Sequence, residues 1–209
     1  MPGTKAFPPK KIVEQIAAEH PTPFYVYHSE GIRNWCRDLQ SAFSWNKGFR
    51  QYFAVKATPN PHIVRLVQEA DCGADCSSLA ELEICERLGI KSDHIIFTSN
   101  NTTKAEYLRA IDLGAIVNLD TPDHLDAVLG FAKRPESISF RFNPGSEAIG
   151  NVLIGNPVES KFGSTRAQLL GGYKSAKNAG VTSLGLHAMI VSNELCIDKL
   201  IANVEMLFK

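Results

Sequence analysis

Lys56 is the only charged residue of the segment QYFAVKATPN, residues 51–60. If this segment is extended, alternate residues share a face, so Tyr52 and Ala54 lie on the face of Lys56 and the phenylalanine and valine between them on the other. Both faces are apolar, as in a parallel strand covered on both sides. Since a buried ammonium is costly unless it is paired, neutralised or covalently used, Lys56 is a candidate nucleophile. A solvent-facing lysine that prevents edge pairing is the alternative.

Polar side chains recur where the other apolar runs of the sequence end. These positions are Asp75 with Ser77 and Ser78, Ser99 with Asn100, Asp120, Arg141 with Asn143, and His187. A (β/α)8 barrel places its functional residues at the carboxyl ends of successive strands. A doubly wound sheet would normally carry a glycine-rich phosphate loop after its first strand, and AVKATPN contains no glycine. The pattern therefore predicts an α/β fold of the (β/α)8, TIM-barrel type.

Six strand-then-helix units must position these residues. The predicted strands are QYFAVKA, GADCSS, HIIFTSN, AIVNLDT, SISFRFNPG and SLGLHAM, and each precedes a segment with the character of a helix. This alternation predicts a parallel sheet with right-handed crossovers. Before these units we expect a helix near residues 10–19, a strand at 22–28, and a helix at 29–43 with Ser29 as its N-cap.

The six units are fewer than the eight of a closed barrel. Open edges of buried parallel strands are a liability, so we expect that the chain is part of a longer polypeptide or that a partner chain supplies the missing units. The expected domains are an N-terminal strand and helix segment at residues 1–47, and a partial barrel at residues 48–209.

The composition favours a small-molecule ligand. Lysine plus arginine and aspartate plus glutamate number 22 each, so no net charge attracts the chain to nucleic acid or to an anionic membrane. The five cysteines form no disulfide framework and are expected to be reduced, and Cys72 with Cys76 is only a weak candidate metal pair. The sequence has no signal-like N-terminus and no run of about 18 apolar residues, which predicts a cytoplasmic protein.

Seven motifs together point to a known family. YFAVKATPNP, GADCSSLAEL, FTSNNTTKAEY, VNLDT, FRFNPG, SKFG and GLHAMIVSN occur in the order seen in the fold-type III pyridoxal-phosphate decarboxylases, whose barrel is of the alanine racemase type. From about residue 22 to the end, the chain resembles the N-terminal half of this family, and most of all its diaminopimelate decarboxylase members. The resemblance implies that the family's C-terminal β domain is absent here.

The resemblance also implies an activity. Lys56 would form the internal Schiff base with pyridoxal 5'-phosphate, and an amino-acid substrate would lose its α-carboxylate as carbon dioxide. The expected reaction converts meso-diaminopimelate to L-lysine in lysine biosynthesis, in an enzyme that is a homodimer at full length. Ornithine, arginine or carboxynorspermidine are alternative substrates. A truncated, non-catalytic protein that binds the cofactor or a partner is the alternative of another class.

Further site residues follow from the matching motifs. Asp75 would lie near Lys56 and set its charge and position, and Arg141 would point toward the phenolic oxygen of the cofactor. As alternatives, Asp75 would be an acid bound by backbone amides, and Arg141 a surface residue.

The last motif departs from the family pattern. His187 matches the first histidine of G-x-H-x-H-x-G-S, and Ser192 matches the serine near the cofactor phosphate. Met189 stands where the second histidine would stack on the pyridine ring. A thioether can lie against an aromatic face, so Met189 either replaces this contact, marks a subgroup or impairs the site. The phosphate loop and the acid that pairs with the pyridinium nitrogen would lie beyond residue 209.

Overall fold

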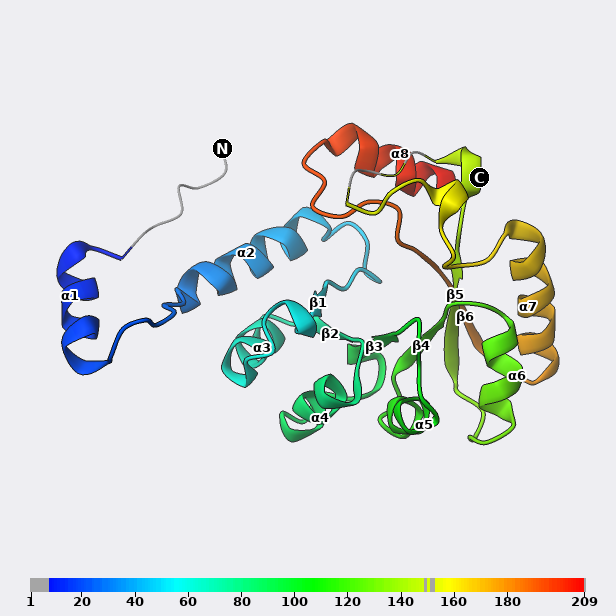
Figure 1. Ribbon diagram of the computed structural model, residues 1–209, viewed down its shortest axis with the longest axis horizontal. Coiled ribbons are helices and arrows are strands. Elements are labelled where there is room, and N and C mark those ends of the chain that lie inside the picture. The colour runs from blue at the N-terminus through cyan, green and yellow to red at the C-terminus, as the bar shows by residue number, and fades with distance from the viewer. Residues whose placement is uncertain (1–7, 149, 151–152, 209) are drawn as a thin grey trace.

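The computed structural model describes residues 8–148, 150 and 153–208, and its centre is one parallel sheet of six strands in chain order. Helices α3 to α7 lie in an arc around the strands (Figure 1). The strands are β1 (Tyr52–Ala54), β2 (Gly73–Cys76), β3 (Ile95–Thr98), β4 (Ile116–Leu119), β5 (Ser137–Phe142) and β6 (Ser183–Ala188). The six predicted strand-then-helix units are confirmed, and the sheet does not close because β1 and β6 have no strand on their outer sides in the described part of the chain.

Each strand is followed by a helix, and a side chain caps the start of four of these helices. Asn60 and Ser78 accept hydrogen bonds from backbone N–H groups at the starts of α3 and α4. Thr103 and Thr165 form capping boxes at α5 and α7, which satisfy amides that a helix start leaves unpaired. The helices are α3 (Pro61–Glu69), α4 (Leu79–Arg87), α5 (Lys104–Asp112), α6 (Asp123–Leu129), α7 (Arg166–Asn178) and α8 (Ile197–Leu207).

The core lies between the sheet and the arc of helices. One row of the sheet runs from Cys76 through Phe97 and Val117 to Ile138, and at most 1% of each residue is exposed. Because side chains alternate along a strand, the residues between them lie on the opposite face, which we call the inner face. The inner face carries polar residues, so the same alternation builds the core on one side and the candidate site on the other.

The N-terminal segment lies outside this sheet. Helix α1 (Lys10–Glu19) has no buried residue and is remote from the strands in Figure 1, whereas α2 (Ser29–Ala42) lies on α3, where Arg33 pairs with Glu69 at 3.2 Å. The strand predicted at residues 22–28 is wrong, because this extended segment lies beside no described strand and makes no ladder hydrogen bonds.

The start of α2 also differs from the prediction. The helix begins at Ser29, but the N-cap position is His28, and no side chain caps the helix there. Among the helices described above, none combines the length and the apolar composition that a membrane span requires.

Candidate functional site

The inner face carries a polar row near the carboxyl ends of the strands. The register aligns Thr98 of β3, Asn118 of β4 and Ser139 of β5. The Asn118 Nδ2 atom donates a hydrogen bond to Thr98 Oγ1 at 2.7 Å. Asn118 and Ser139 are buried, although polar residues in a sheet core are uncommon. This row was not singled out from the sequence, because a threonine, an asparagine and a serine in separate apolar runs carry no motif.

Lys56 lies at the carboxyl end of β1, and its side chain is exposed. The prediction of a buried lysine within the strand is wrong. The strand ends at Ala54, and Val55–Ala57 form a 3-10 turn in which Val55 is the buried residue. Because β1 is an edge strand, nothing described covers the position from the far side. The amine of Lys56 is therefore accessible to a ligand.

Asp75 lies next to Lys56 across the sheet. Its register partner on β1 is Ala54, two residues before Lys56. Burial raises the pKa of the Asp75 carboxyl, and the nearby Thr98 hydroxyl and the charge of Lys56 offset part of that rise. The structure thus brings the lysine and the carboxyl within electrostatic reach of each other.

Ser77 and Ser78, which follow Asp75 in the same motif, bind the first turn of helix α4. The Ser78 hydroxyl donates to Glu81 Oε1 at 2.8 Å, and the Ser77 backbone N–H donates to Glu81 Oε2 at 3.0 Å. Glu81 is only 7% exposed, so its carboxylate is held by the first turn of α4. Ser77 and Ser78 directly follow β2, as predicted, and the structure adds that they bind the first turn of α4.

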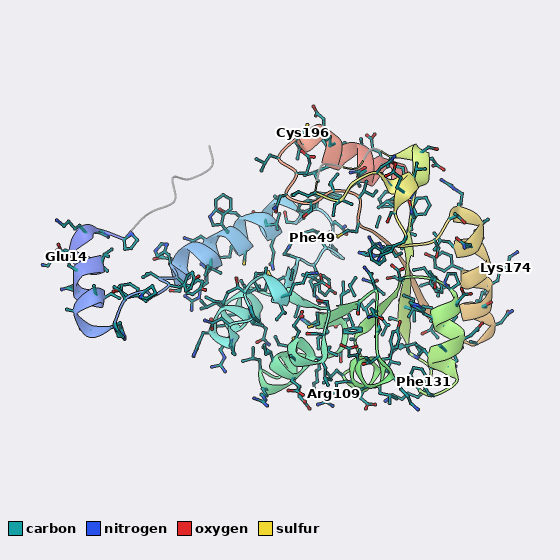
Figure 2. The ribbon with its side chains drawn as sticks, in the orientation of Figure 1. Glu14, Phe49, Arg109, Phe131, Lys174 and Cys196 are labelled. Carbon is teal, nitrogen blue, oxygen red and sulfur yellow. The ribbon has the colours of Figure 1, made fainter. Side chains whose placement is uncertain are left out.

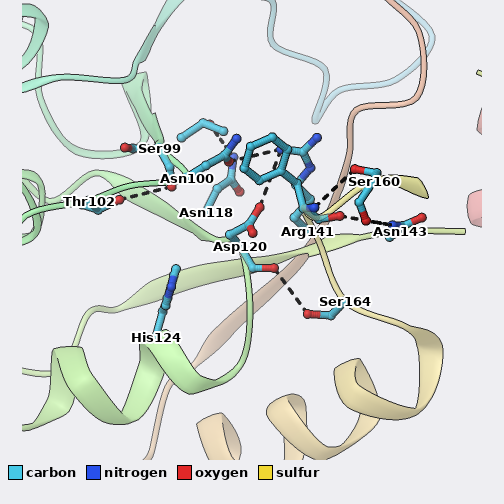
Figure 3. Close-up of polar contacts among 12 residues, drawn as sticks. Ser99, Asn100, Thr102, Asn118, Asp120, His124, Arg141, Asn143, Ser160 and Ser164 are labelled. Carbon is cyan, nitrogen blue, oxygen red and sulfur yellow. Dashed lines mark hydrogen bonds and ion pairs between the residues drawn. The ribbon is translucent and has the colours of Figure 1, made fainter. Parts of the chain in front are cut away.

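Arg141 is the centre of a polar cluster at the end of β5 (Figure 3). Its Nη1 atom donates to Asn100 Oδ1 at 3.1 Å and lies 3.6 Å from Asp120 Oδ1. The side chains of Arg141 and Asp120 are 12% and 7% exposed. The guanidinium carbon lies 5.2 Å from the centre of the Phe162 ring, a cation–π distance. The neighbouring residues Phe140 and Phe142 are buried, and strand alternation places them on the face opposite Arg141.

The loop after β5 is fastened beside this cluster. Asn143 Nδ2 donates to the Phe162 carbonyl at 3.2 Å, and the Ser164 hydroxyl donates to the Asp120 carbonyl at 3.3 Å. Gly163 has a φ of +82°, and a Cβ there would lie 3.2 Å from Arg141, so a side chain would be strained and crowded. The loop thereby brings Phe162 against Arg141, a contact that sequence spacing did not reveal.

His187 lies opposite Arg141 in the register of β5 and β6. Burial, with a further contribution from the charge of Arg141, lowers the pKa of His187 to about 4. Met189 follows the end of β6 and is 45% exposed, so strand alternation does not place it on the face of His187. It nevertheless lines a small pocket together with Arg141 and Phe162. Ser192 is half-buried in the segment after it.

The inner face contains polar atoms that need partners. Four buried atoms form no hydrogen bond within the described part of the chain, namely Asp75 Oδ1, Asp120 Oδ1, Ser139 Oγ and His187 Nδ1. A buried polar atom without a partner is costly, so this group fits a polar ligand that carries both donors and acceptors. The five cysteines are free, and the residues that the structure describes contain no cluster of three or more metal-ligating side chains.

Comparison with known proteins shows similar relatives. Residues 30–208 match the family described as "Pyridoxal-dependent decarboxylase, pyridoxal binding domain". The chain is 38% identical to protein TabA of Pseudomonas amygdali pv. tabaci, and the match covers 90% of this chain and 44% of TabA. It is 32% identical to the diaminopimelate decarboxylase of Methanothermobacter thermautotrophicus, over 92% of this chain and 46% of that protein.

The fold has a matching crystal structure, that of diaminopimelate decarboxylase from M. jannaschii in complex with L-lysine. The TM-score is 0.78 at 26% identity, over 94% of this chain and 49% of that one. The chain thus spans less than half the length of these relatives. Because the family match covers most of the chain and includes β1 to β6, the chain belongs to the pyridoxal-dependent decarboxylase family and contains its pyridoxal binding domain.

Proposed function

We propose that this chain is the cofactor-binding part of a pyridoxal-phosphate-dependent amino-acid decarboxylase, and that Lys56 binds the cofactor covalently through Nζ. The observation that carries the proposal is an accessible amine at the carboxyl end of β1, next to a row of buried polar atoms without partners, in a pyridoxal binding domain. Such atoms suit pyridoxal phosphate, which has a ring nitrogen, a phenolic oxygen and a phosphate. When bound, this cofactor supplies an electron sink for the charge left by a departing carboxylate.

The proposed roles follow the positions of the side chains. Asp75 orients Lys56 and balances its charge, and Arg141 donates hydrogen bonds to the phenolic oxygen. His187 and Met189 lie against the ring, and Ser192 contacts the phosphate. With a pKa of about 4, His187 is neutral near pH 7 and can accept or donate a hydrogen bond without adding a second cation beside Arg141.

Replacement of Lys56 tests the covalent link. In the full-length protein, pyridoxal phosphate is added, borohydride reduction follows, and the labelled residue is found by peptide mass spectrometry. We expect label on Lys56 and none in Lys56→Ala, which should fold because the side chain is exposed. Lys174→Ala is the matched control, because Figure 2 shows Lys174 at the outer rim of α7. If Lys56→Ala is labelled at another residue to the same extent as the wild type, the assignment is refuted.

The proposed reaction is the decarboxylation of meso-diaminopimelate to L-lysine, a step of lysine biosynthesis. Several relatives named diaminopimelate decarboxylase and a related structure with L-lysine support it. TabA has a higher sequence identity to this chain than these relatives, and it is not named a diaminopimelate decarboxylase. The substrate therefore needs a direct test. Carbon dioxide release should be measured with meso-diaminopimelate, ornithine, arginine and carboxynorspermidine. Release from another member of the panel alone would refute the substrate, and cofactor binding with no release at all would favour a non-catalytic protein.

We also propose that the full-length protein is a cytoplasmic homodimer, as the family resemblance implies. Sedimentation of the full-length protein checks the dimer, and a monomer at micromolar concentration would contradict it.

A further inference from the structure

The Arg141 cluster contains a buried acid to which the proposed function assigns no role of its own. Asp120 is 7% exposed, and its Oδ1 atom has no hydrogen-bond partner in the described residues although Arg141 Nη1 is 3.6 Å away. Burying a carboxylate is expensive unless a positive charge compensates it. Among the described residues, Arg141 is the cation that pairs with Asp120, so the two charges depend on each other.

The polar contacts of Arg141 with other described residues use a single nitrogen of its guanidinium. In the part of the chain that the structure describes, its hydrogen bond to Asn100 and its ion pair with Asp120 both use Nη1. A guanidinium has further N–H donors on Nη2 and Nε. They remain available to an acceptor on the ligand, and the Phe162 ring covers the guanidinium from the loop side.

Asp120 itself is fixed by its backbone. Its carbonyl accepts a hydrogen bond from Ser164, which is 1% exposed. Ser164 is in turn joined to β5, because its backbone N–H donates to the Arg141 carbonyl at 2.8 Å. Ser164 therefore bonds to the backbones of both Asp120 and Arg141, which places the two side chains at neighbouring strand ends.

We propose that Asp120, assisted by Asn100, is a positioning residue that holds Arg141 by its Nη1 edge and turns its remaining donors toward an anionic oxygen of the bound cofactor. This inference rests on the proposed function, because it requires that the cofactor lies on the inner face. In this role Asp120 acts through Arg141.

The test compares two aspartates of the same chain. In the full-length protein, the Kd of pyridoxal phosphate is measured by absorbance titration for Asp120→Asn and for Asp112→Asn. Asp112 is the matched control, because it lies at the same 3.6 Å from a cation, Lys133, but at an exposed site. We expect about tenfold weaker binding for Asp120→Asn, and less than about a twofold change for Asp112→Asn. Equal Kd values for the two variants would overturn the proposal.

A double-mutant cycle separates positioning from a general structural role. If Asp120 acts through Arg141, adding Asp120→Asn to Arg141→Gln should not weaken binding further, because the guanidinium that it positions is gone. If Asp120→Asn weakens cofactor binding in the Arg141→Gln variant as much as it does in the wild type, the proposal is overturned. The unfolding midpoint of each variant is measured in parallel. If Asp120→Asn does not fold, Asn100→Ala at its exposed site replaces it and should weaken binding in the same direction; an unchanged Kd would then count against the inference.

The outcome is distinct from failure of the proposed function. If wild-type protein takes up no pyridoxal phosphate at Lys56, the proposed function fails, and this inference fails with it. If the wild type is labelled and Asp120→Asn binds as the wild type does, only the role of Asp120 is refuted.

Discussion

His187 should make the stability of the cofactor-free protein depend on pH in a defined interval. Its pKa is about 4 in the folded protein, against an ordinary value of 6.5, because burial and the charge of Arg141 oppose protonation. Between these two values the unfolded chain binds a proton that the folded protein does not bind. Stability is therefore unaffected by His187 above pH 6.5 and decreases as the pH falls from 6.5 toward 4.

The size of the effect follows from the two pKa values. At about pH 5 the unfolded histidine is almost fully charged and the folded one is mostly neutral, which costs up to about 2 kcal/mol of unfolding free energy. Partial solvent access to the side chain makes this an upper value. In His187→Asn this contribution is absent, so the stability of wild type relative to the variant should fall by up to about 2 kcal/mol between about pH 7.5 and pH 5.

Urea unfolding of wild type and His187→Asn at both pH values measures this difference, because the other histidines titrate in both proteins. An NMR titration should place the midpoint of His187 near 4, and Arg141→Gln should raise it because the second cause of the shift is removed. A wild-type midpoint near 6.5, or a stability difference that is the same at both pH values, would refute the reasoning.

Two further predictions concern stability. Gly172→Ala should destabilise the protein by about 1–3 kcal/mol, because a Cβ there would lie 2.8 Å from the ring of Pro122. At the adjacent Gly171 a Cβ would meet open space, so Gly171→Ala should stabilise the protein by up to about 1 kcal/mol. Equal shifts of the urea unfolding midpoint in the two variants would contradict this packing. Thr103→Ala should cost about 1 kcal/mol through loss of the capping box with Glu106, and an unchanged unfolding midpoint would show that the box is not stabilising.

The order of the helices and strands could be predicted because it depends on local pattern. Each of the six units has an apolar run of strand type, a cap or turn residue and a helical period, and these features act over only a few residues. The predicted strand at residues 22–28 failed for a complementary reason. Its sequence suits a strand, but a strand requires a neighbour for its backbone hydrogen bonds, and no described strand lies beside it.

At the candidate site, Lys56 also has one property that the local sequence predicts and one that depends on neighbouring segments. Its spacing within an apolar run correctly drew attention to the residue, but its burial depends on what covers β1, and in the structure the side chain is exposed. Likewise, Asp120 and Arg141 could each be placed at a strand end from the sequence. Their 3.6 Å pairing and the approach of Phe162 depend on a loop that returns to β5 through Asn143 and Ser164.

The sequence by itself therefore determined the fold class, the order of the elements and the residue types available for chemistry, because these depend on short-range periodicity and on motifs. Only the tertiary structure decided which polar atoms meet, which remain without a partner, and which side chains are open to a ligand. Those properties arise from contacts between segments that are distant in the sequence, such as the bond between Asp120 and Ser164, and no local pattern encodes their geometry.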